Sequence, residues 1–330
     1  MDFENFIAGK DDDGRRLFRV LKSLLQDGAQ IHQLLRKSLI KLNGKKADAG
    51  DKVCEGDEIR IPAFLLRGGA HDDKKQNLEK SANENLILEN TILRTPDFLI
   101  VNKPYDVSVQ GGKENLCDIV ASIFERENKS TSLSFRPGPL HRLDRKTTGV
   151  LVFSQSLEGA KWFSEQLSAH NIQKTYIAII EGKLEKSERW EDFISSEGDD
   201  KTNKEVFHKV CARTNTAEKS AKLAITNAIP LSYGKYHGKD VTLAQFRIET
   251  GRKHQIRAQS ALHGHSLLGD TAYGAQKISE AQDFFLHAYR LEFPENNPFS
   301  LPKNIDAFIL TNFQKMLNKL LIKWDYTRII

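Results

Sequence analysis

The stretch HRLDRKTTGVLVF, residues 141–153, governs how the chain is organised. Its first half is dense in charge, and its second half, from Gly149, is an apolar run typical of a buried strand. Asp144 stands between Arg142 and Arg145 on the loop that opens into this strand. Flanking guanidinium groups favour the ionised form of a carboxyl, which suits a nucleophile or an electrostatic stabiliser. An Arg–Asp–Arg salt-bridge network with a purely structural role fits the same residues.

Apolar periodicity on both sides of this stretch predicts a large α+β segment that begins at about Leu88. A short apolar run or a period of two indicates a strand, and a period of 3.6 indicates a helix. The predicted strands cover residues 98–101, 149–153, 175–180 and 244–249, and the predicted helices carry Ala160, Phe163 and Leu167 or the stripe Phe313, Met316, Leu317, Leu320, Leu321 and Trp324. Residues 183–220 are charged and poorly patterned, which predicts a surface insertion.

Residues 14–62 form a second unit with its own periodicity. Two amphipathic helices are predicted near residues 17–24 and 31–35, followed by a tight turn at Asn43–Gly44 and a short strand at 58–61. Between residues 15 and 62 there are eleven Lys and Arg but six Asp and Glu, whereas the first 13 residues hold five acids and one lysine. A small basic unit is the electrostatic footprint of nucleic-acid binding, and an ordinary solvated surface is the alternative.

The expected domain organisation follows from these composition changes. We expect an acidic tail at residues 1–13, a basic domain at 14–62, a polar linker at 63–87 and a larger domain at 88–330. Mean hydropathy is −0.49, and no run approaches the ~18 apolar residues of a membrane span. The first residues lack a secretory signal, and the three cysteines lie far apart without metal-ligand spacing. A cytoplasmic protein without a metal site or a membrane partner is therefore expected.

A second charged cluster, GRKHQIR at residues 251–257, follows the predicted strand at 244–249. Arg252 and Arg257 can contact phosphates or a carboxylate, although a basic helix start is the plainer interpretation. His254, His263 and His265 lie nearby, but no acid completes a familiar metal-ligand spacing. They are interpreted as ordinary polar histidines.

Five motifs in this order resemble the RluA-type pseudouridine synthases. The motifs are NKPYDVSVQGG, HRLDRKTTG, KTYIAIIEG, GRKHQIRAQSALHGHSLLGDTAYG and LHAYRLEF, and they span residues 98–293. Residues 14–62 resemble an S4 RNA-binding domain. The resemblance implies an α+β fold, in which a small S4-like α/β domain precedes a catalytic domain built on a mixed, mainly antiparallel sheet with flanking helices.

The resemblance also implies roles for individual residues. Asp144 corresponds to the catalytic aspartate, Tyr176 to the tyrosine that stacks on the target base, and Arg257 to the arginine that pairs with the aspartate. Arg142 corresponds to the arginine that enters the RNA stack as the uridine flips out. Further RNA contacts are expected from His141, Arg145, Arg252 and Lys103 and, in the S4-like domain, from Arg16, Arg36, Lys37 and Lys45. Departures from the family pattern occur at Asp106, Gln110, Lys146, Thr148, Lys253 and Gln259.

The expected activity is the isomerisation of uridine to pseudouridine in structured RNA, foremost 23S (large-subunit) ribosomal RNA. The reaction involves no redox change and no group transfer, so neither a nucleotide nor any other cofactor is expected. A monomer is expected. A carboxylate near C1′ can attack the sugar or promote glycal formation, and the sequence leaves both routes open.

Two other functions fit part of the pattern. A non-catalytic S4-type RNA-binding or assembly factor is disfavoured because Asp144, Tyr176 and Arg257 are all present. A retaining glycosidase normally needs a second carboxylate ~5–5.5 Å from the nucleophile, and the motifs contain no obvious one.

Overall fold

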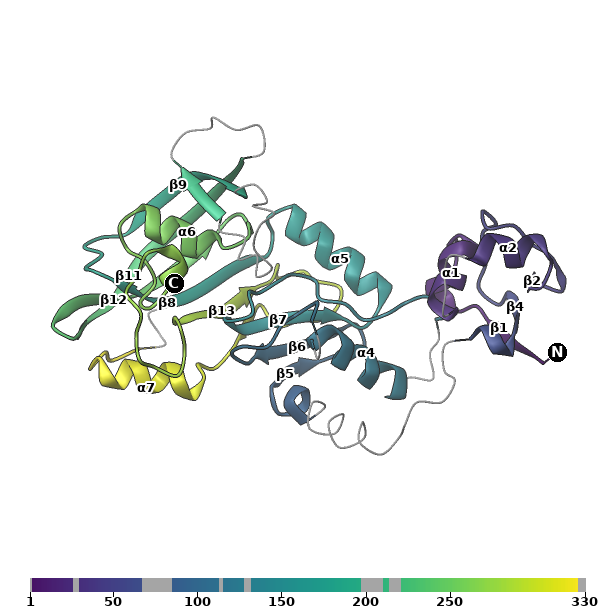
Figure 1. Ribbon diagram of the computed structural model, residues 1–330, viewed down its shortest axis with the longest axis horizontal. Coiled ribbons are helices and arrows are strands. Elements are labelled where there is room, and N and C mark those ends of the chain that lie inside the picture. The colour runs from purple at the N-terminus through teal and green to yellow at the C-terminus, as the bar shows by residue number, and fades with distance from the viewer. Residues whose placement is uncertain are drawn as a thin grey trace.

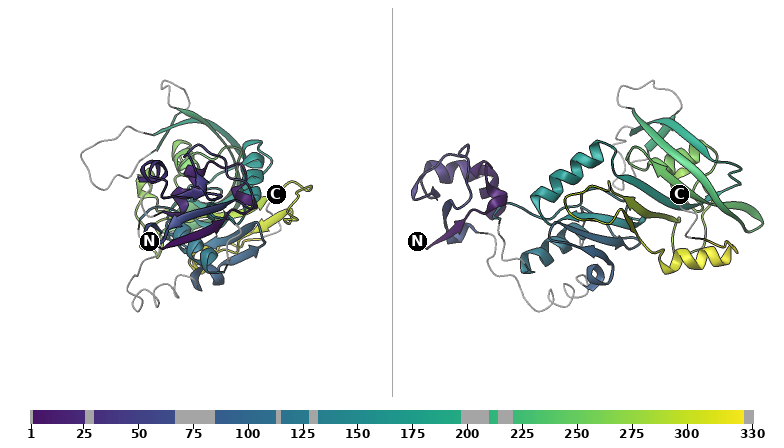
Figure 2. Two further views of the ribbon diagram at one scale, coloured as in Figure 1. Left: turned by 90° about the vertical axis from the view of Figure 1, so that its right-hand side faces the viewer. Right: turned by 180° about the vertical axis from the view of Figure 1, so that it is seen from behind.

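The computed structural model describes residues 2–25, 30–66, 85–112, 115–127, 132–196, 210–213 and 221–325. These residues form an N-terminal body around a four-stranded sheet and a larger body around a ten-stranded sheet, which lie at opposite ends of the molecule (Figure 1 and Figure 2). None of the described helices is long and apolar enough to cross a membrane. Most of the predicted linker, residues 67–84, lies outside the described residues.

The N-terminal body combines two short helices with the sheet β1–β4–β2–β3. Its helices are α1 (Leu17–Leu24) and α2 (Ile31–Arg36), and three of its strands are β2 (Lys41–Leu42), β3 (Lys45–Lys46) and β4 (Glu58–Pro62). Asn43 and Gly44 form the predicted two-residue turn with φ of 50° and 71°, which matches the backbone twist of the two strands. The apolar faces of both helices pack on β4, and this packing closes a separate core.

The first 13 residues are not the expected acidic tail. Phe3–Ile7 is strand β1, which pairs antiparallel with β4 along its whole length and forms the edge of the small sheet. The Arg60 guanidinium on β4 lies over the Phe3 ring, 4.3 Å from its centroid. The acidic composition concealed the strand because only Phe6 of β1 packs against the core.

Asp12, in the short 3-10 helix Lys10–Asp12, fastens the N-terminal body to the large one. Its side chain is fully buried. The carboxylate accepts hydrogen bonds from the Ser132 hydroxyl (3.0 Å), from the backbone N–H groups of Leu133 (2.7 Å) and Ser134 (3.0 Å), and from the Ser134 hydroxyl. Leu133 packs against the core of the N-terminal body, and Arg15 Nη1 donates to the Ser134 hydroxyl (3.0 Å). Residues 132–134 of the large body are therefore clamped to the small one.

The large sheet is mixed and mainly antiparallel, as expected. Its order is β10–β9–β11–β12–β8–β13–β7–β6–β5, with β14 paired to β13, and the parallel neighbours are β13 and β7. The strands are β5 (Thr91–Arg94), β6 (Phe98–Lys103), β7 (Thr148–Ser154), β8 (Gln173–Glu181), β9 (Glu188–Ser196), β10 (Val210–Arg213), β11 (Lys222–Tyr236), β12 (Lys239–Ile248), β13 (Leu286–Glu292) and β14 (Asn304–Asp306). The predicted strands at 98–101, 149–153, 175–180 and 244–249 correspond to β6, β7, β8 and β12.

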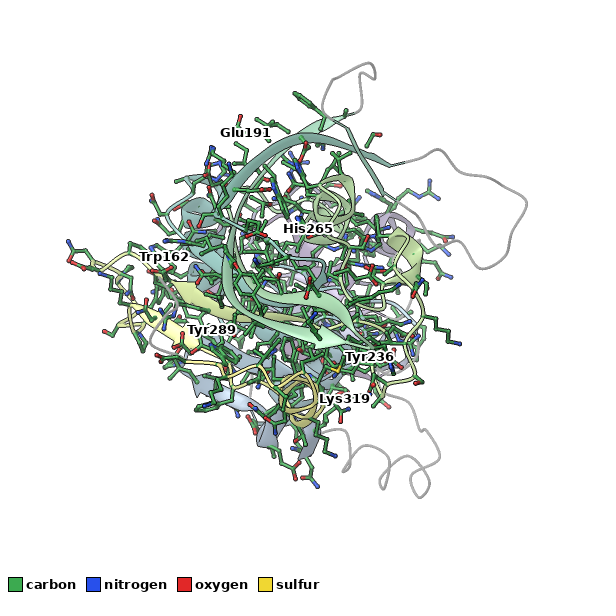
Figure 3. The ribbon with its side chains drawn as sticks, turned by 90° about the vertical axis from the view of Figure 1, so that its left-hand side faces the viewer. Trp162, Glu191, Tyr236, His265, Tyr289 and Lys319 are labelled. Carbon is green, nitrogen blue, oxygen red and sulfur yellow. The ribbon has the colours of Figure 1, made fainter. Side chains whose placement is uncertain are left out.

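Helices cover both faces of this sheet. α4 (Leu116–Glu127) and α6 (Gln255–Leu262) share a core with Tyr176 and Phe246, whereas α5 (Leu157–Ser168) and α7 (Thr311–Lys319) pack on the opposite face. The Lys319 ammonium on α7 lies over the Tyr236 ring of β11, 5.2 Å from its centroid (Figure 3). The functional site described below lies on the face of the sheet that α4 and α6 cover.

Two further predictions are wrong in part. The expected surface insertion at 183–220 contains β9, whose Trp190 and Asp192 are only 1% exposed; residues 197–209 and 214–220 lie outside the described part of the chain. Asp192 Oδ2 accepts a hydrogen bond from Gln259 Nε2 (2.7 Å) and pairs with His263 (3.0 Å), so that it joins β9 to α6. Leu321 leaves the predicted C-terminal stripe because α7 ends at Lys319, and its side chain is exposed.

Candidate active site

The HRLD loop, residues 141–144, lies beside β7, where one backbone hydrogen bond ties the residue before the loop to β7 and another closes the turn after it. The Leu140 N–H donates to the Val152 carbonyl (2.8 Å), and the Thr147 N–H donates to the Asp144 carbonyl (3.0 Å). Leu143 is buried, whereas Arg142 is exposed and Asp144 is 18% exposed. Arg142 and Asp144 line a cavity of about 420 Å³, together with residues of β8 and α6.

Gly149 allows the loop to join the sheet at this point. It has a φ of 111°, and a Cβ there would lie 2.2 Å from the Ala288 carbonyl oxygen of β13. Glycine is the residue that tolerates both this conformation and this approach. β7 can therefore pair with β13 directly after the loop, which places Asp144 near the centre of the sheet.

The prediction that Lys103 contacts RNA is wrong. Lys103 is fully buried at the end of β6, and its Nζ donates to the carbonyl oxygens of Pro104 (2.9 Å), Val107 (2.8 Å) and Arg145 (2.7 Å). Three acceptors match the three N–H bonds of an ammonium group. Burial lowers the pKa of Lys103 to about 7, and the charge of Asp144 opposes this shift. Lys103 therefore fixes the backbone at Arg145, directly after the HRLD loop.

The neighbours of Asp144 differ from those expected. Arg145 pairs with Asp106, at 3.0 Å between Nε and Oδ1, and therefore does not flank the Asp144 carboxylate. Arg257 Nη1 and His254 Nε2 lie 3.7 and 3.6 Å from Asp144 Oδ2. The predicted proximity of Arg257 and Asp144 is present, although it is looser than a direct hydrogen bond.

Arg257 is held by a partner that the sequence did not reveal. It is buried on α6, and its Nε and Nη2 donate to the two carboxylate oxygens of Asp270 at 2.7 and 2.8 Å. The rings of Tyr273 and Phe284 lie 4.9 and 4.6 Å from the guanidinium carbon. This bidentate pair fixes the guanidinium plane and leaves Nη1 directed toward Asp144.

His254 belongs to the site, although its sequence context indicated an ordinary polar histidine. It occupies the residue before α6 with a left-handed φ of 53°, and its Nδ1 lies 2.9 Å from the Tyr273 hydroxyl. Burial, followed by the charge of Arg257, lowers the pKa of His254 to about 4, and the charge of Asp144 opposes the shift. The imidazole is therefore neutral at pH 7. No local sequence signal marks His254, because its partners Asp144 and Tyr273 are brought to it by the fold.

Tyr176 projects from the middle of β8 into the same cavity. Its ring is 8% exposed and packs between Phe246 of β12 and Ala288 of β13, its neighbours across the sheet. Burial raises the pKa of its hydroxyl, and the nearby Asp144 charge adds to the effect. The phenol therefore keeps its proton and presents an uncharged aromatic face to the cavity.

The other predicted RNA-binding residues divide into exposed and anchored side chains. Arg142 and Arg252 are exposed on the cavity rim, where Arg252 Nε donates to the Leu223 carbonyl (3.0 Å). His141 is anchored, because its Nε2 accepts from the Val152 N–H (3.2 Å) and its ring stacks on Phe163. The basic residues of the N-terminal body, Arg16, Arg36, Lys37 and Lys45, are all exposed and form no ion pair with the described residues.

The acids around Asp144 do not resemble the second carboxylate of a glycosidase. Glu249, Asp270 and Asp283 line the cavities beside Asp144. Each of them is bonded to a cation, Glu249 to Arg189, Asp270 to Arg257 and Asp283 to Lys146. These hydrogen bonds lower the pKa of Glu249 and of Asp283. A carboxylate in such a pair is a poor proton donor, so the geometry argues against glycoside hydrolysis.

Comparison with known proteins agrees with this geometry. A family model described as RNA pseudouridylate synthase matches residues 97–262, half of the chain. A Rickettsia bellii protein named ribosomal large subunit pseudouridine synthase C is 27% identical over 305 residues, which cover 91% of this chain and 95% of that protein. A Haemophilus ducreyi protein named tRNA pseudouridine synthase C is 29% identical over 252 residues, which cover 72% of this chain and 96% of that protein.

A solved structure shares the fold. The human protein named RNA pseudouridylate synthase domain containing 4 superposes with a TM-score of 0.60 at 19% identity, covering 75% of this chain and 99% of its own. The matched family segment contains Asp144, Tyr176 and Arg257, the three residues that the folded chain gathers around one cavity. The chain belongs to the RluA-type RNA pseudouridylate synthase family and is an isomerase that acts on uridines in RNA.

Proposed function

We propose that this isomerase converts uridines of large-subunit ribosomal RNA to pseudouridine and that the Asp144 carboxylate reacts at the ribose of the target uridine. The observation that carries the choice of RNA is coverage: the ribosomal relative matches 91% of this chain, whereas the tRNA relative matches 72%. The larger share that the ribosomal relative matches favours a common arrangement of domains. Exposed basic residues of the S4-like N-terminal body then supply additional contacts to a long RNA.

Isomerisation replaces the bond between C1′ and N1 with a bond between C1′ and C5. The N1–C1′ bond breaks, the uracil turns, a C5–C1′ bond forms, C5 loses its proton and N1 gains one. Asp144 either attacks C1′ or removes a proton from C2′ and later returns it, and either route leaves the carboxylate unchanged at the end. The pair formed by Arg257 and Asp270 orients a positive charge toward the carboxylate throughout.

Access to C1′ requires that the target base leave its stack. Extruding a base costs a few kcal/mol, which the enzyme must offset with its own contacts. Tyr176 offers an aromatic face on which the extruded base stacks, a contact that contributes ~1–3 kcal/mol. Arg142 is exposed two residues before Asp144 and fills the space that the base vacates.

Pseudouridine mapping tests the proposal. Purified enzyme is incubated with large-subunit ribosomal RNA or with tRNA, and Asp144→Asn serves as the inactive control. We expect pseudouridine at defined positions of the ribosomal RNA; free uracil would indicate hydrolysis, and neither product would indicate a binding protein. Conversion of tRNA alone would overturn the choice of substrate. Mapping total RNA from cells with and without the gene then identifies the positions.

A charge-neutral variant of the N-terminal body tests its part in binding. Arg16, Arg36, Lys37 and Lys45 are replaced together by Gln, which keeps the Asp12 clamp intact. Every phosphate that the variant no longer binds lowers the slope of log K against log salt by ~0.7–0.9, so the removal of three or four such interactions is easily measured. An unchanged slope on long ribosomal RNA, with unchanged thermal stability, would exclude RNA binding by these residues.

A further inference from the structure

Lys174 is a charged side chain of the active-site cavity that the reaction described above does not use. It lies on β8 two residues before Tyr176, and the two side chains share one face of the strand. Lys174 and Tyr176 line the cavity together with Ile172, which directly precedes the strand. The neighbours of Lys174 across the sheet are Ile248 of β12 and Leu291 of β13, both apolar.

The Lys174 ammonium is partly buried without a partner of opposite charge. Its Nζ makes no ion pair and no hydrogen bond with the described residues. Burial lowers the pKa of Lys174. Glu249, the acid of this cavity besides Asp144, is bonded to Arg189. A partly buried cation that no anion compensates costs free energy, and an anionic ligand supplies the missing charge.

The wall opposite Lys174 is shaped to leave room for its head group. A Cβ added to Gly251 would lie 3.0 Å from the Lys174 Nζ, so the absence of a side chain at residue 251 leaves room for the ammonium at this part of the cavity lining. Arg252 and Lys253 follow Gly251, and Arg142 lies on the rim. Besides Lys174, the cavity is therefore lined by three further basic side chains, Arg142, Arg252 and Lys253.

We propose that Lys174 forms an anion subsite that receives a phosphodiester directly next to the target uridine while the base stacks on Tyr176. Residues i and i+2 of a strand stand ~6.6 Å apart, since each residue advances ~3.3 Å. Base and phosphate of one nucleotide are separated by a single sugar, so one strand holds both ends of the nucleotide. The proposal rests on the isomerase acting on RNA and does not depend on which RNA carries the uridine.

Removing the charge tests the subsite. Lys174→Met should raise the apparent KM at least ten-fold while kcat changes less, and it should lower the salt slope of binding by ~0.7, the value for one phosphate of a single strand. Lys174→Arg should recover part of the binding. Lys161→Met, which removes an exposed lysine of α5 outside the cavity, is the matched control and should behave as the wild type.

Thermal unfolding separates this role from a structural one. Removing an uncompensated buried charge should leave Tm of Lys174→Met equal to or above that of the wild type, whereas removing a packing residue lowers it. Gly251→Ala, which crowds the ammonium, should weaken binding in the same direction.

RNA with a single uncharged linkage provides the decisive comparison. Short RNAs that the wild type converts are prepared with one methylphosphonate on the 5′ or the 3′ side of the target. When one of these two linkages is neutral, the difference in KM between wild type and Lys174→Met should disappear. A ten-fold difference that persists with both neutral linkages would overturn the subsite, as would a Lys174→Met variant with unchanged KM. Failure of the wild type to convert ribosomal RNA concerns the choice of substrate and leaves this comparison intact for any RNA that is converted.

Discussion

Replacing Asp12 by Ala should release the N-terminal body from residues 132–134 while the large sheet stays folded. Four hydrogen bonds cross from this segment to the buried carboxylate. A hydrogen bond to a charged group contributes about 1.5–3 kcal/mol, and water that enters the gap replaces part of it. We therefore expect a loss of about 3–5 kcal/mol, because four donors lose a charged acceptor and water replaces a large part of each bond. At 1.4 kcal/mol for each factor of ten, docking weakens between roughly a hundred-fold and several thousand-fold.

Hydrogen exchange measures this release directly. The amide hydrogens of Leu133 and Ser134 are donated to Asp12, so their protection should fall in Asp12→Ala, while amides of β7 and β13 keep theirs. Asp11→Ala is the matched control, because it removes the same charge one residue away from a side chain that makes no hydrogen bond or ion pair with the described residues. Equal protection of residues 132–134 in wild type and Asp12→Ala would refute the clamp, and so would an equal loss in Asp11→Ala.

Four other outcomes can be checked. Asp144→Asn should abolish isomerisation and leave RNA affinity within a few-fold, so substantial turnover by this variant removes Asp144 from the reaction. Tyr176→Phe should lower the single-turnover rate more than it lowers affinity, because the stacking ring remains; an unchanged rate means that the hydroxyl takes no part. Lys103→Met removes three partly buried hydrogen bonds at about 1 kcal/mol each, so urea unfolding should show a loss of about 3 kcal/mol, with an unchanged salt slope for RNA. Burial lowers the pKa of His287 to about 4, whereas the unfolded chain takes up this proton near pH 6.5; the free energy of unfolding should therefore fall by up to about 1.4 kcal/mol per unit as pH drops from 6.5 to 4, and His287→Gln should flatten the slope.

Local apolar patterns made several central strands predictable. β6, β7, β8 and β12 bury side chains from inside the sheet, so their apolar patterns report their positions locally. The tight turn at Asn43–Gly44 is likewise a local property. Asp144, Tyr176 and Arg257 could be assigned to one site from the sequence because the family motifs give all three a role in the same reaction.

Features that depend on partners far away in the chain could not be predicted from the sequence. Asp12 and Asp192 are buried acids whose hydrogen-bond donors lie 120 and 67 residues away, at Ser132 and Gln259, and no local pattern announces such a partner. Lys103 has the composition of an RNA contact but directs its three donors to backbone carbonyls. A charged residue enters the interior only when the fold supplies its partners, and those partners become visible only when the chain is folded.

The parallel pairing of β7 with β13 has a consequence for the time course of folding. His287 pairs with Thr148, so residues 139 positions apart must meet before the strand beside the HRLD loop gains its second neighbour. Contacts of such sequence separation form late, because the loop that joins them must be closed first. During synthesis β6 and β7 can pair early, but β13 becomes available only after most of the chain has left the ribosome. A nascent chain that ends before Leu286 therefore carries Asp144 without the strand that completes its cavity, and catalytic competence should appear abruptly with the last strands rather than grow with chain length.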